Sequence, residues 1–292
     1  MTLFAVVLNW NGGEDTATAL GSLAGIETIC VDNGSEDGSD RVVAERFPDV
    51  ELIRNGANLG FAGGCNVGIR RALERGADWV LLLNSDAVAR RGLSGALAQA
   101  ATERPDAGLI ACLVLFEDGA RVQSAGGRFN ALLGYSGRSP SHGSLVMPVG
   151  LSDVGRVDGA AFAVSRVAIE KAGLLDEQLF AYVEDVEWSL RIRGAGFAIV
   201  LAPDARAQHK GSASTGGRAS TTNLYYDTRN TIVVCERHRP LPRGLRALRR
   251  SVIVGAHLVQ ALLHPSRVAA ARAVLHGWSD ARAGRLGQSS SR

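Results

Sequence analysis

Asp86 stands where a side chain could take part in phosphate chemistry. It closes the segment Leu83-Asn84-Ser85-Asp86, which follows an uncharged hydrophobic run, so Asp86 leaves a buried strand at its carboxyl end. A carboxylate there can hold a hard divalent cation, which in turn binds phosphate oxygens. The alternative is that Asp86 only caps the next helix, as aspartate often does.

Glu184 and Asp185 form a second acidic site, at the start of a helix predicted over 184–194. Adjacent carboxylates at a helix start point in different directions, so one can cap the helix or pair with an arginine while the other faces a substrate. A carboxylate in a cleft can act as general base toward a sugar hydroxyl. Taken alone, such a pair also has a purely structural interpretation.

His209 could supply a nitrogen ligand to the same cation as Asp86, because it ends a short predicted strand. A lone histidine is otherwise structural or exposed. Asp32, in the segment VDNGS (31–35), could accept hydrogen bonds from a pyrimidine N–H or from ribose hydroxyls. The same residue types are also common in turns.

Two further segments could bind anions. Segment 58–66, NLGFAGGCN, resembles a loop that leads into a helix N-terminus, but it lacks the G-x-G-x-x-G spacing of a dinucleotide site. Arg229 lies on a helix predicted over 222–238, where it could bind a phosphate or hold a carboxylate of the fold.

The elements that must position these residues alternate in the first 116 residues. Hydrophobic runs at 3–9, 28–33, 50–54, 79–84 and 108–116 are separated by amphipathic segments around 14–24, 37–47, 62–75 and 92–103. Unbroken hydrophobic runs separated by helices predict a mainly parallel α/β sheet. Polar residues follow several of these runs, at the edge where open α/β sheets bind ligands.

The rest of the chain is predicted to complete this sheet and to add helices. We expect hairpins and loops over 117–157, a strand at 158–165, a helix at 166–173 and a strand pair at 197–202 and 205–209, followed by basic helices to about 278. We therefore predict a catalytic domain over 1–238 and a basic helical extension over 239–292.

Charge divides the chain of 292 residues unevenly. Residues 206–292 hold 15 basic and 3 acidic residues, whereas residues 1–205 hold 17 basic and 26 acidic ones. A basic block of this kind suits an anionic membrane face, a lipid diphosphate or nucleic acid, or it is a solvated arginine-rich helical surface. Because aromatic residues make up only 5% of the chain, we expect no nucleic-acid partner.

Hydrophobic stretches and cysteines bear on location. The longest hydrophobic stretch, 251–263, is too short to span a membrane, and the N-terminus is predicted to be a strand and not a signal peptide. The four cysteines show no C-x-x-C pair, so we expect free thiols in a reducing cytosol.

Eight segments in order strongly resemble glycosyltransferase family 2, and within it the bacterial rhamnosyltransferase-like branch. The resemblance covers about residues 3–235 and is carried by VVLNWNG (6–12), VDNGSEDGS (31–39), NLGFAGGCNVGI (58–69), LLLNSDA (81–87), DGAAFAVSR (158–166), FAYVEDVEWSLRIRGAGF (180–197), HKGSAS (209–214) and YYDTRN (225–230). It implies a GT-A fold, a Rossmann-like nucleotide-diphospho-sugar transferase with C-terminal helices. It also implies a nucleotide-sugar donor, a divalent metal (Mg²⁺ or Mn²⁺) and an inverting mechanism.

The resemblance also implies roles for individual residues. Asp185 matches the catalytic base. Asp86 matches the last carboxylate of the D-x-D motif, whose first position is Asn84 here, and His209 matches the second metal ligand. The donor-binding residues are expected to be Leu8, Asn9, Asn11, Asp32, Asn58, Gly60, Asn66, Asn84 and Ser85. We assign Glu184, Trp188 and Gly159 to acceptor or sugar contacts, although for Trp188 the core is favoured over sugar stacking. We assign Arg229 and Lys210 to phosphate.

We therefore expect an inverting glycosyltransferase that moves rhamnose or another deoxysugar from a dTDP- or UDP-linked donor to an acceptor hydroxyl. The acceptor would be a glycan, a lipid-linked sugar or a natural product. We expect the enzyme in the cytoplasm, with peripheral contact to the inner, anionic membrane face and a homodimer as further expectations.

Two alternatives remain open. A sugar-phosphate nucleotidyltransferase would need a glycine-rich basic loop after the first strand, whereas segment 9–14 (NWNGGE) is acidic. A catalytically inert nucleotide-sugar-binding or membrane-surface protein would not need Asp86, Asp185 and His209 together.

Overall fold

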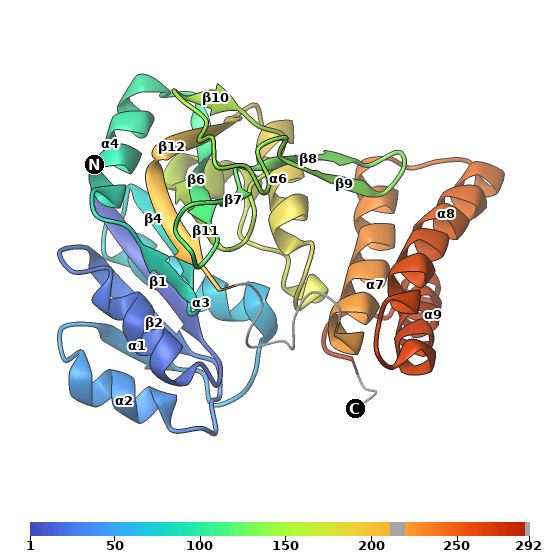
Figure 1. Ribbon diagram of the computed structural model, residues 1–292, viewed down its shortest axis with the longest axis horizontal. Helices are drawn as coiled ribbons and strands as arrows, with labels where there is room; N and C mark the ends of the chain where they lie inside the picture. Colours follow the sequence, from blue (N-terminus) through green and yellow to red (C-terminus); the bar gives the residue numbers. More distant parts are fainter. Residues whose placement is uncertain (211–219, 290–292) are drawn as a thin grey trace.

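A computed structural model describes residues 1–210 and 220–289 of the chain (Figure 1). Its centre is a ten-stranded sheet with the path β10-β12-β6-β11-β4-β1-β2-β3; β5 pairs with β12, and β7 with β6. The strands on this path are β1 (Leu3–Asn9), β2 (Glu27–Asp32), β3 (Glu51–Arg54), β4 (Trp79–Asn84), β6 (Ala107–Leu115), β10 (Ser152–Asp153), β11 (Ala161–Ser165) and β12 (Ala198–His209). The two strands that pair off the path are β5 (Ala87–Ala89) and β7 (Val122–Ser124).

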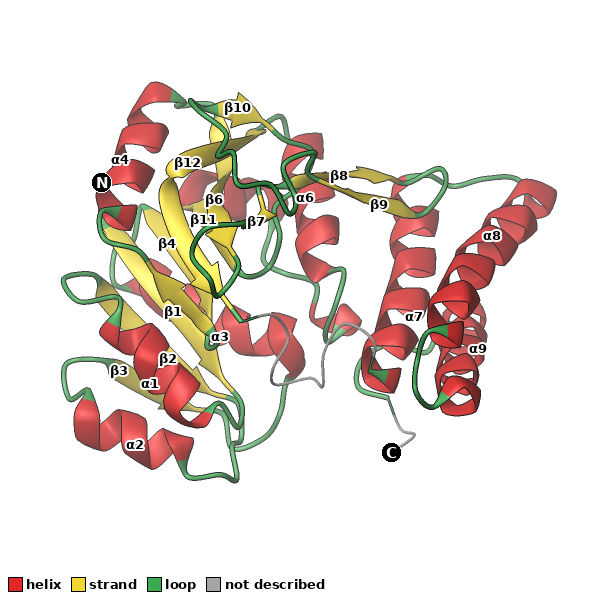
Figure 2. Ribbon diagram, viewed as in Figure 1, coloured by secondary structure: helices red, strands yellow, loops and turns green. Residues whose placement is uncertain are grey.

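Helices cover both faces of this sheet, as unbroken hydrophobic strands require (Figure 2). The helices α1 (Gly13–Gly21), α2 (Ser39–Arg46) and α4 (Leu93–Glu103) supply buried residues to the core on one face. The core on the opposite face includes residues of α3 (Gly60–Glu74), α5 (Arg166–Ala172) and α6 (Glu184–Gly194). A short 3-10 helix, η1 (Glu177–Leu179), precedes α6. The mainly parallel α/β architecture predicted from the sequence is confirmed.

Strand pairing is parallel through β4-β1-β2-β3 and between β6 and β12, whereas β11 is antiparallel to both β4 and β6. The parallel strands end together, so Asn9, Asp32 and Asn84 lie at one edge of the sheet. This edge is the one at which open α/β sheets bind ligands.

The last predicted strand pair differs from prediction. The predicted strand pair at 197–202 and 205–209 is a single strand, β12, which stays parallel to β6 on both sides of a register shift between Ala202 and Arg206. Pro203 lies inside the shift and has no N–H to donate, so the chain bulges there and then continues in the same direction.

The loop region 117–157 contains the predicted hairpin, formed by β8 (Gly127–Asn130) and β9 (Tyr135–Arg138). The C-terminal part forms three helices, α7 (Thr221–His238), α8 (Arg243–Leu262) and α9 (Arg267–Ala283), around a hydrophobic core of their own. The helix α9 lies close against α7, since a Cβ at Gly277 would be 2.4 Å from the carbonyl oxygen of Tyr225. No helix in the described ranges is long and hydrophobic enough to cross a membrane.

Candidate active site

A cavity of about 760 Å³ lies between the carboxyl edge of the sheet and the C-terminal helices. Its sheet side includes many of the residues expected at the site: Leu8, Asn58, Gly60, Asn84, Ser85, Asp86, Gly159, Glu184, Asp185 and His209. Its other side includes residues of the helices and of the C-terminus: Thr221, Thr222, Asn223, Tyr225, Tyr226, Ala273, His276, Gln288 and Ser289. The cavity therefore brings together the strand-end residues and the predicted carboxyl pair.

Asp86 and His209 meet at one end of this cavity. The Nε2 atom of His209 is 3.1 Å from Oδ1 of Asp86, and both side chains are largely buried. The Nδ1 atom of His209 is 2.7 Å from Oε1 of Gln123, and the amide nitrogen of Gln123 donates to the carbonyl of His209. An amide oxygen can only accept, so Nδ1 carries the imidazole proton.

In a neutral imidazole, Nε2 then presents a lone pair toward the carboxylate oxygen of Asp86. Among the described residues, this buried nitrogen has no hydrogen bond of acceptable geometry. Two lone pairs at this separation repel each other unless a proton or a metal cation lies between them. A second hydrogen bond that fixes the ring and its tautomer is also usual for metal-ligating histidines, so the residues fit a divalent cation.

The carboxyl pair lies in the cavity wall, with Glu184 buried and Asp185 half-buried. Asp185 accepts two backbone N–H groups, from Gly159 at 2.9 Å and from Val186 at 2.7 Å. Burial raises the pKa of Asp185 to about 6; the nearby Arg156 lowers this pKa, and Asp158 raises it. Asp185 is therefore mostly ionised at pH 7 and can accept a proton.

Glu184 is in the opposite state. Burial, followed by the charge of Asp185, raises the pKa of Glu184 to about 8, so that this carboxyl is mostly protonated at pH 7. Its Oε2 atom is buried without a hydrogen-bond partner in the described part of the chain. A neutral carboxyl of this kind can donate a hydrogen bond to a sugar hydroxyl.

A strained turn presents this pair to the cavity. Phe180, Tyr182 and Val183 all have positive φ angles, of 65°, 66° and 69°. Such angles are costly for a β-branched residue such as Val183 and persist only when the surroundings enforce them.

Asn230 of α7 and Gly60 of α3 provide that enforcement. The side-chain amide of Asn230 donates to the carbonyls of Leu179, Ala181 and Tyr182 at 2.7–2.9 Å. A Cβ at Gly60 would lie 2.4 Å from the carbonyl oxygen of Phe180, so only glycine allows this approach. The turn before Glu184 is thus held from both sides.

Three predicted donor-binding residues, Asn9, Asn11 and Asp32, do not line the cavity. The Nδ2 atom of Asn9 donates to Asp32 at 2.8 Å, and its Oδ1 atom accepts from Thr16 at 2.7 Å, so Asn9 ties the ends of β1 and β2 together. Asp32 also accepts the N–H of Ser35, and the side chain of Asn11 accepts that of Glu36. These residues shape the strand ends, and the next residue after Asp32, Asn33, lines the cavity.

Four other predicted residues do not line the cavity. Trp188 lies one helical turn after Glu184, fully buried in the core, where it packs against Phe162 of β11 and donates to the carbonyl of Gly173. Asn66 holds the backbone of Leu175 at both polar atoms of its amide. Lys210 pairs with Asp15. Segment 211–214, part of the resemblance to the family, lies outside the described residues.

Arg229 is the fourth of these residues, and it is 1% exposed. Its guanidinium donates to the carbonyls of Leu179 and Gly287 and to the side chain of Asn230, between the rings of Tyr225 and Tyr226. All three guanidinium nitrogens are engaged, which leaves no free edge for the predicted phosphate contact.

Other cavity residues were missed from the sequence. The cavity is also lined by Gln123 and Ser124, at the end of β7. A third such residue is Asp158, directly before Gly159. Asp158 pairs with Arg156 and accepts from Ser124. In the sequence, only the turn-type dipeptide Asp158-Gly159 could have drawn attention to Asp158. No local sequence feature marks Gln123.

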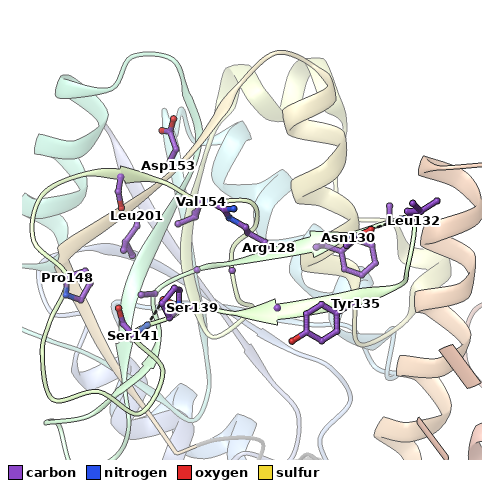
Figure 3. A pocket seen from close by; sticks show the side chains of 18 of the residues that line it. Arg128, Asn130, Leu132, Tyr135, Ser139, Ser141, Pro148, Asp153, Val154 and Leu201 are labelled. Atoms are coloured by element: carbon purple, nitrogen blue, oxygen red, sulfur yellow. Dashed lines mark hydrogen bonds between the residues drawn. The ribbon is translucent and has the colours of Figure 1, made fainter. Parts of the chain in front are cut away.

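A second cavity, of about 1050 Å³, lies along the β8–β9 hairpin (Figure 3). Its charged lining residues are Arg128, Asp153 and Arg239, and Asp153 is already paired with Arg104. It contains none of the strand-end residues, so the smaller cavity is the candidate active site.

The fold is the GT-A fold of glycosyltransferases, with the candidate site at the carboxyl ends of its parallel strands. Staphylococcus aureus TarS 1–349 in complex with UDP-GlcNAc has a similar fold, with a TM-score of 0.59 and 13% identity over 98% of this chain and 93% of that one. The mannosyltransferase PcManGT from Pyrobaculum calidifontis, in complex with GDP-Man and Mn²⁺, gives a TM-score of 0.56 and 16% identity over 97% and 75% of the chains.

Sequence comparison identifies the family. The family described as Glycosyl transferase family 2 matches residues 7–171. The N-acetylglucosaminyl-diphospho-decaprenol L-rhamnosyltransferase of Mycobacterium tuberculosis is 31% identical over 264 residues, which is 83% of this chain and 86% of the relative. The chain therefore belongs to glycosyltransferase family 2, as the sequence motifs predicted.

Proposed function

We propose that the protein transfers L-rhamnose, or another deoxysugar, from a dTDP-linked donor to a hydroxyl of a lipid-linked glycan, with inversion. The observation that carries this proposal is that the Glu184–Asp185 pair and the Asp86–His209 pair line one cavity. The mycobacterial relative, an L-rhamnosyltransferase whose name includes a decaprenol diphosphate, supports the sugar and the acceptor class. A UDP-hexose is the second donor candidate, and a soluble natural product is the second acceptor candidate.

Asp185 would act as the general base. Inversion by one direct displacement needs a proton acceptor on the acceptor hydroxyl, on the face opposite the leaving diphosphate. The N–H of Gly159 holds one carboxylate oxygen of Asp185, which fixes the orientation of the base. Glu184, protonated beside it, would donate a hydrogen bond to a sugar or acceptor hydroxyl.

Asp86 and His209 would hold Mg²⁺ or Mn²⁺. When bound, the cation would neutralise charge on the leaving diphosphate. No third histidine, cysteine or acidic side chain joins them among the residues that the structure describes. Such cations are often bound through one or two protein ligands together with substrate phosphates and water, which suits this pair. Asn84, at the first D-x-D position, would contribute only a neutral oxygen.

The donor would lie along the strand ends, against Leu8, Asn58, Gly60 and Ser85. Asn58 accepts the N–H of Gly60 and the amide of Asn33, so this stretch is ordered before any ligand binds.

We expect the enzyme in the cytoplasm, in keeping with four buried thiols that form no disulfide in the described chain.

Transfer assays with Mn²⁺ test the proposal. Purified protein is incubated with dTDP-rhamnose or a UDP-hexose and a short-chain prenyl-diphosphate sugar, and the anomeric configuration of the product is read by NMR. We expect a rhamnoside of inverted configuration, formed by the wild type and not by Asp185→Asn. Retention of configuration, or release of pyrophosphate from a sugar phosphate and a nucleoside triphosphate, would contradict it.

A further inference from the structure

The solvent-facing side of α8 has an unusual composition for the surface of a protein helix. Its exposed large side chains are Leu245, Leu248, Val252, Val259, Leu262 and, just after the helix, Leu263, each 50–85% exposed. Between Arg250 and Arg267 the sequence has no Asp, Glu, Lys or Arg. A surface helix normally turns its charged residues outward and its hydrophobic ones inward.

After its first turn, which holds Arg243 and Arg246, the charged residues of α8 face inward instead. Arg249 is buried and donates to the carbonyls of Ala131 and Arg239, and Arg250 pairs with Glu236 of α7. His257 faces Asp227 of α7 at 3.3 Å. The outward face is therefore hydrophobic over residues 245–263, a length of about 27 Å at 1.5 Å per residue.

A second element extends this hydrophobic surface. The tip of the β8–β9 hairpin contacts α8, since a Cβ at Gly134 would lie 2.5 Å from Cδ1 of Ile253. Leu132 and Leu133 at this tip are 47% and 54% exposed. Figure 3 shows Leu132 at the end of the hairpin. Exposed hydrophobic side chains therefore come from two elements that touch each other, and gathered hydrophobic surface of this kind marks a site of interaction.

Arginines lie near both ends of the hydrophobic face. Arg239 and Arg243 precede it and Arg267 and Arg272 follow it; all four are exposed, and none has a carboxylate partner in the described ranges. Residues 239–289 contain nine arginines and one acidic residue, Asp280. Two copies of such a unit would repel each other, and the small uncharged residues beside the face, such as Ser251 and Ala256, lack the charged flanks of a coiled-coil seam.

From this pattern we infer that α8 and the hairpin tip dock on an anionic lipid bilayer, with the hydrophobic face in the acyl–headgroup boundary and the arginines among the headgroups. This is the arrangement of an amphipathic helix that lies in the membrane interface. It differs from attraction by the basic C-terminal block alone, because it requires the uncharged outward face.

The docking face is close to the candidate active site. The helix α9 contributes Ala270 and Val274 to the core that it shares with α8, and Ala273 and His276 to the cavity. Only one helix therefore separates the membrane-facing helix from the cavity, a distance on the order of 10 Å. Docking would hold the cavity near the lipid headgroups, where the acceptor would be a sugar carried on a prenyl diphosphate. This choice of acceptor rests on the proposed function, whereas the docking does not.

Vesicle co-sedimentation tests the docking. Wild-type protein is mixed with vesicles of phosphatidylcholine alone or with phosphatidylglycerol, at low and high salt. The variant Leu248→Glu/Val259→Glu places charge on the outward face at two exposed positions. Val167→Glu, at a 60% exposed valine of α5, is the matched control.

We expect the wild type and Val167→Glu to bind phosphatidylglycerol vesicles, less at high salt, and the double variant to bind at least about ten-fold less. Equal binding by the double variant, or no wild-type binding at low salt, would overturn the inference. A wild-type dimer in sedimentation velocity that becomes monomeric in the double variant would also overturn it, by making the face an interface between copies. If the vesicle results hold but no donor sugar is transferred to any acceptor, the proposed function fails and the docking remains.

Discussion

Changing the two adjacent carboxyl groups separately, as Asp185→Asn and Glu184→Gln, distinguishes the proton acceptor from its neutral neighbour. With a pKa of about 6, Asp185 is ionised in about one molecule in ten at pH 5 and about nine in ten at pH 7. Turnover at saturating donor should therefore rise about ten-fold between these pH values. Asp185→Asn keeps the shape but cannot accept the proton, so turnover should fall by about 10²–10⁴-fold.

Glu184→Gln should behave differently. With a pKa of about 8, Glu184 is protonated in about nine molecules in ten at pH 7, and glutamine imitates this neutral form. The variant should therefore be close to wild type at pH 7. Above pH 8 the wild type acquires a second negative charge beside the base and loses activity, whereas the variant should keep it.

The pH dependence of Tm provides an independent check on the raised pKa of Glu184. The folded-state pKa of Glu184, about 8, is above the value near 4.3 of an unfolded chain. The protonated form therefore stabilises the fold fully below about pH 4.3, and this contribution is lost as the pH rises toward 8, by up to about 1.4 kcal/mol per pH unit. Glu184→Gln escapes this loss, so its Tm should rise relative to wild type between pH 5 and pH 8.

The assay is initial transfer rate at saturating donor from pH 5 to pH 9, with Tm measured in the same buffers. The reasoning is refuted if Asp185→Asn turns over at near the wild-type rate, or if Glu184→Gln loses more activity than Asp185→Asn at pH 7. If Glu184→Gln lost activity above pH 8 as the wild type does, a group other than Glu184 would be responsible for that loss.

Two other perturbations follow from contacts in the site. Asp86→Ala should abolish the Mn²⁺-dependent part of nucleoside-diphosphate affinity, measured by calorimetry, at an unchanged Tm; undiminished metal dependence would exclude Asp86 as a ligand. Asn230→Ala leaves the carbonyls of the strained turn without their side-chain donor, so it should cost about 1–3 kcal/mol of unfolding free energy and lower kcat more than donor affinity. If kcat is unaffected while Tm falls, Asn230 stabilises the fold without positioning the carboxyl pair.

The sequence is most informative where hydrophobic runs and strand ends decide the outcome. Parallel strands must end together, which is why the order of runs and polar residues is enough to assign Asp86 and Asn84 to one edge of the sheet. Periodicity does not reveal that Pro203 leads to a bulge and not a turn, because both use the same residue types.

Residues on helices are harder to assign than residues at strand ends. Arg229 and Trp188 are adjacent in sequence to functional segments, yet one fills its donors with backbone carbonyls and the other packs into the core. The direction in which a helical side chain points depends on how the helix packs, which motifs do not record. Ala273 and His276 carry no local signal at all, because α9 reaches the cavity only through tertiary packing.

The close contact between α9 and α7 has a consequence for the fate of the donor sugar. Since Gly277 lets α9 approach the backbone of Tyr225, this contact brings Ala273 and His276 to the cavity wall that faces the carboxyl pair. A wall that fits poorly admits water, and water competes with the acceptor for the anomeric carbon. Gly277→Ala, by pushing α9 outward, should therefore turn part of the transfer into donor hydrolysis, measurable as free sugar released without acceptor; an unchanged ratio would mean that this wall does not exclude water. The ratio of sugar transfer to donor hydrolysis would then depend on the absence of a Cβ at Gly277, a residue far in sequence from the carboxyl pair.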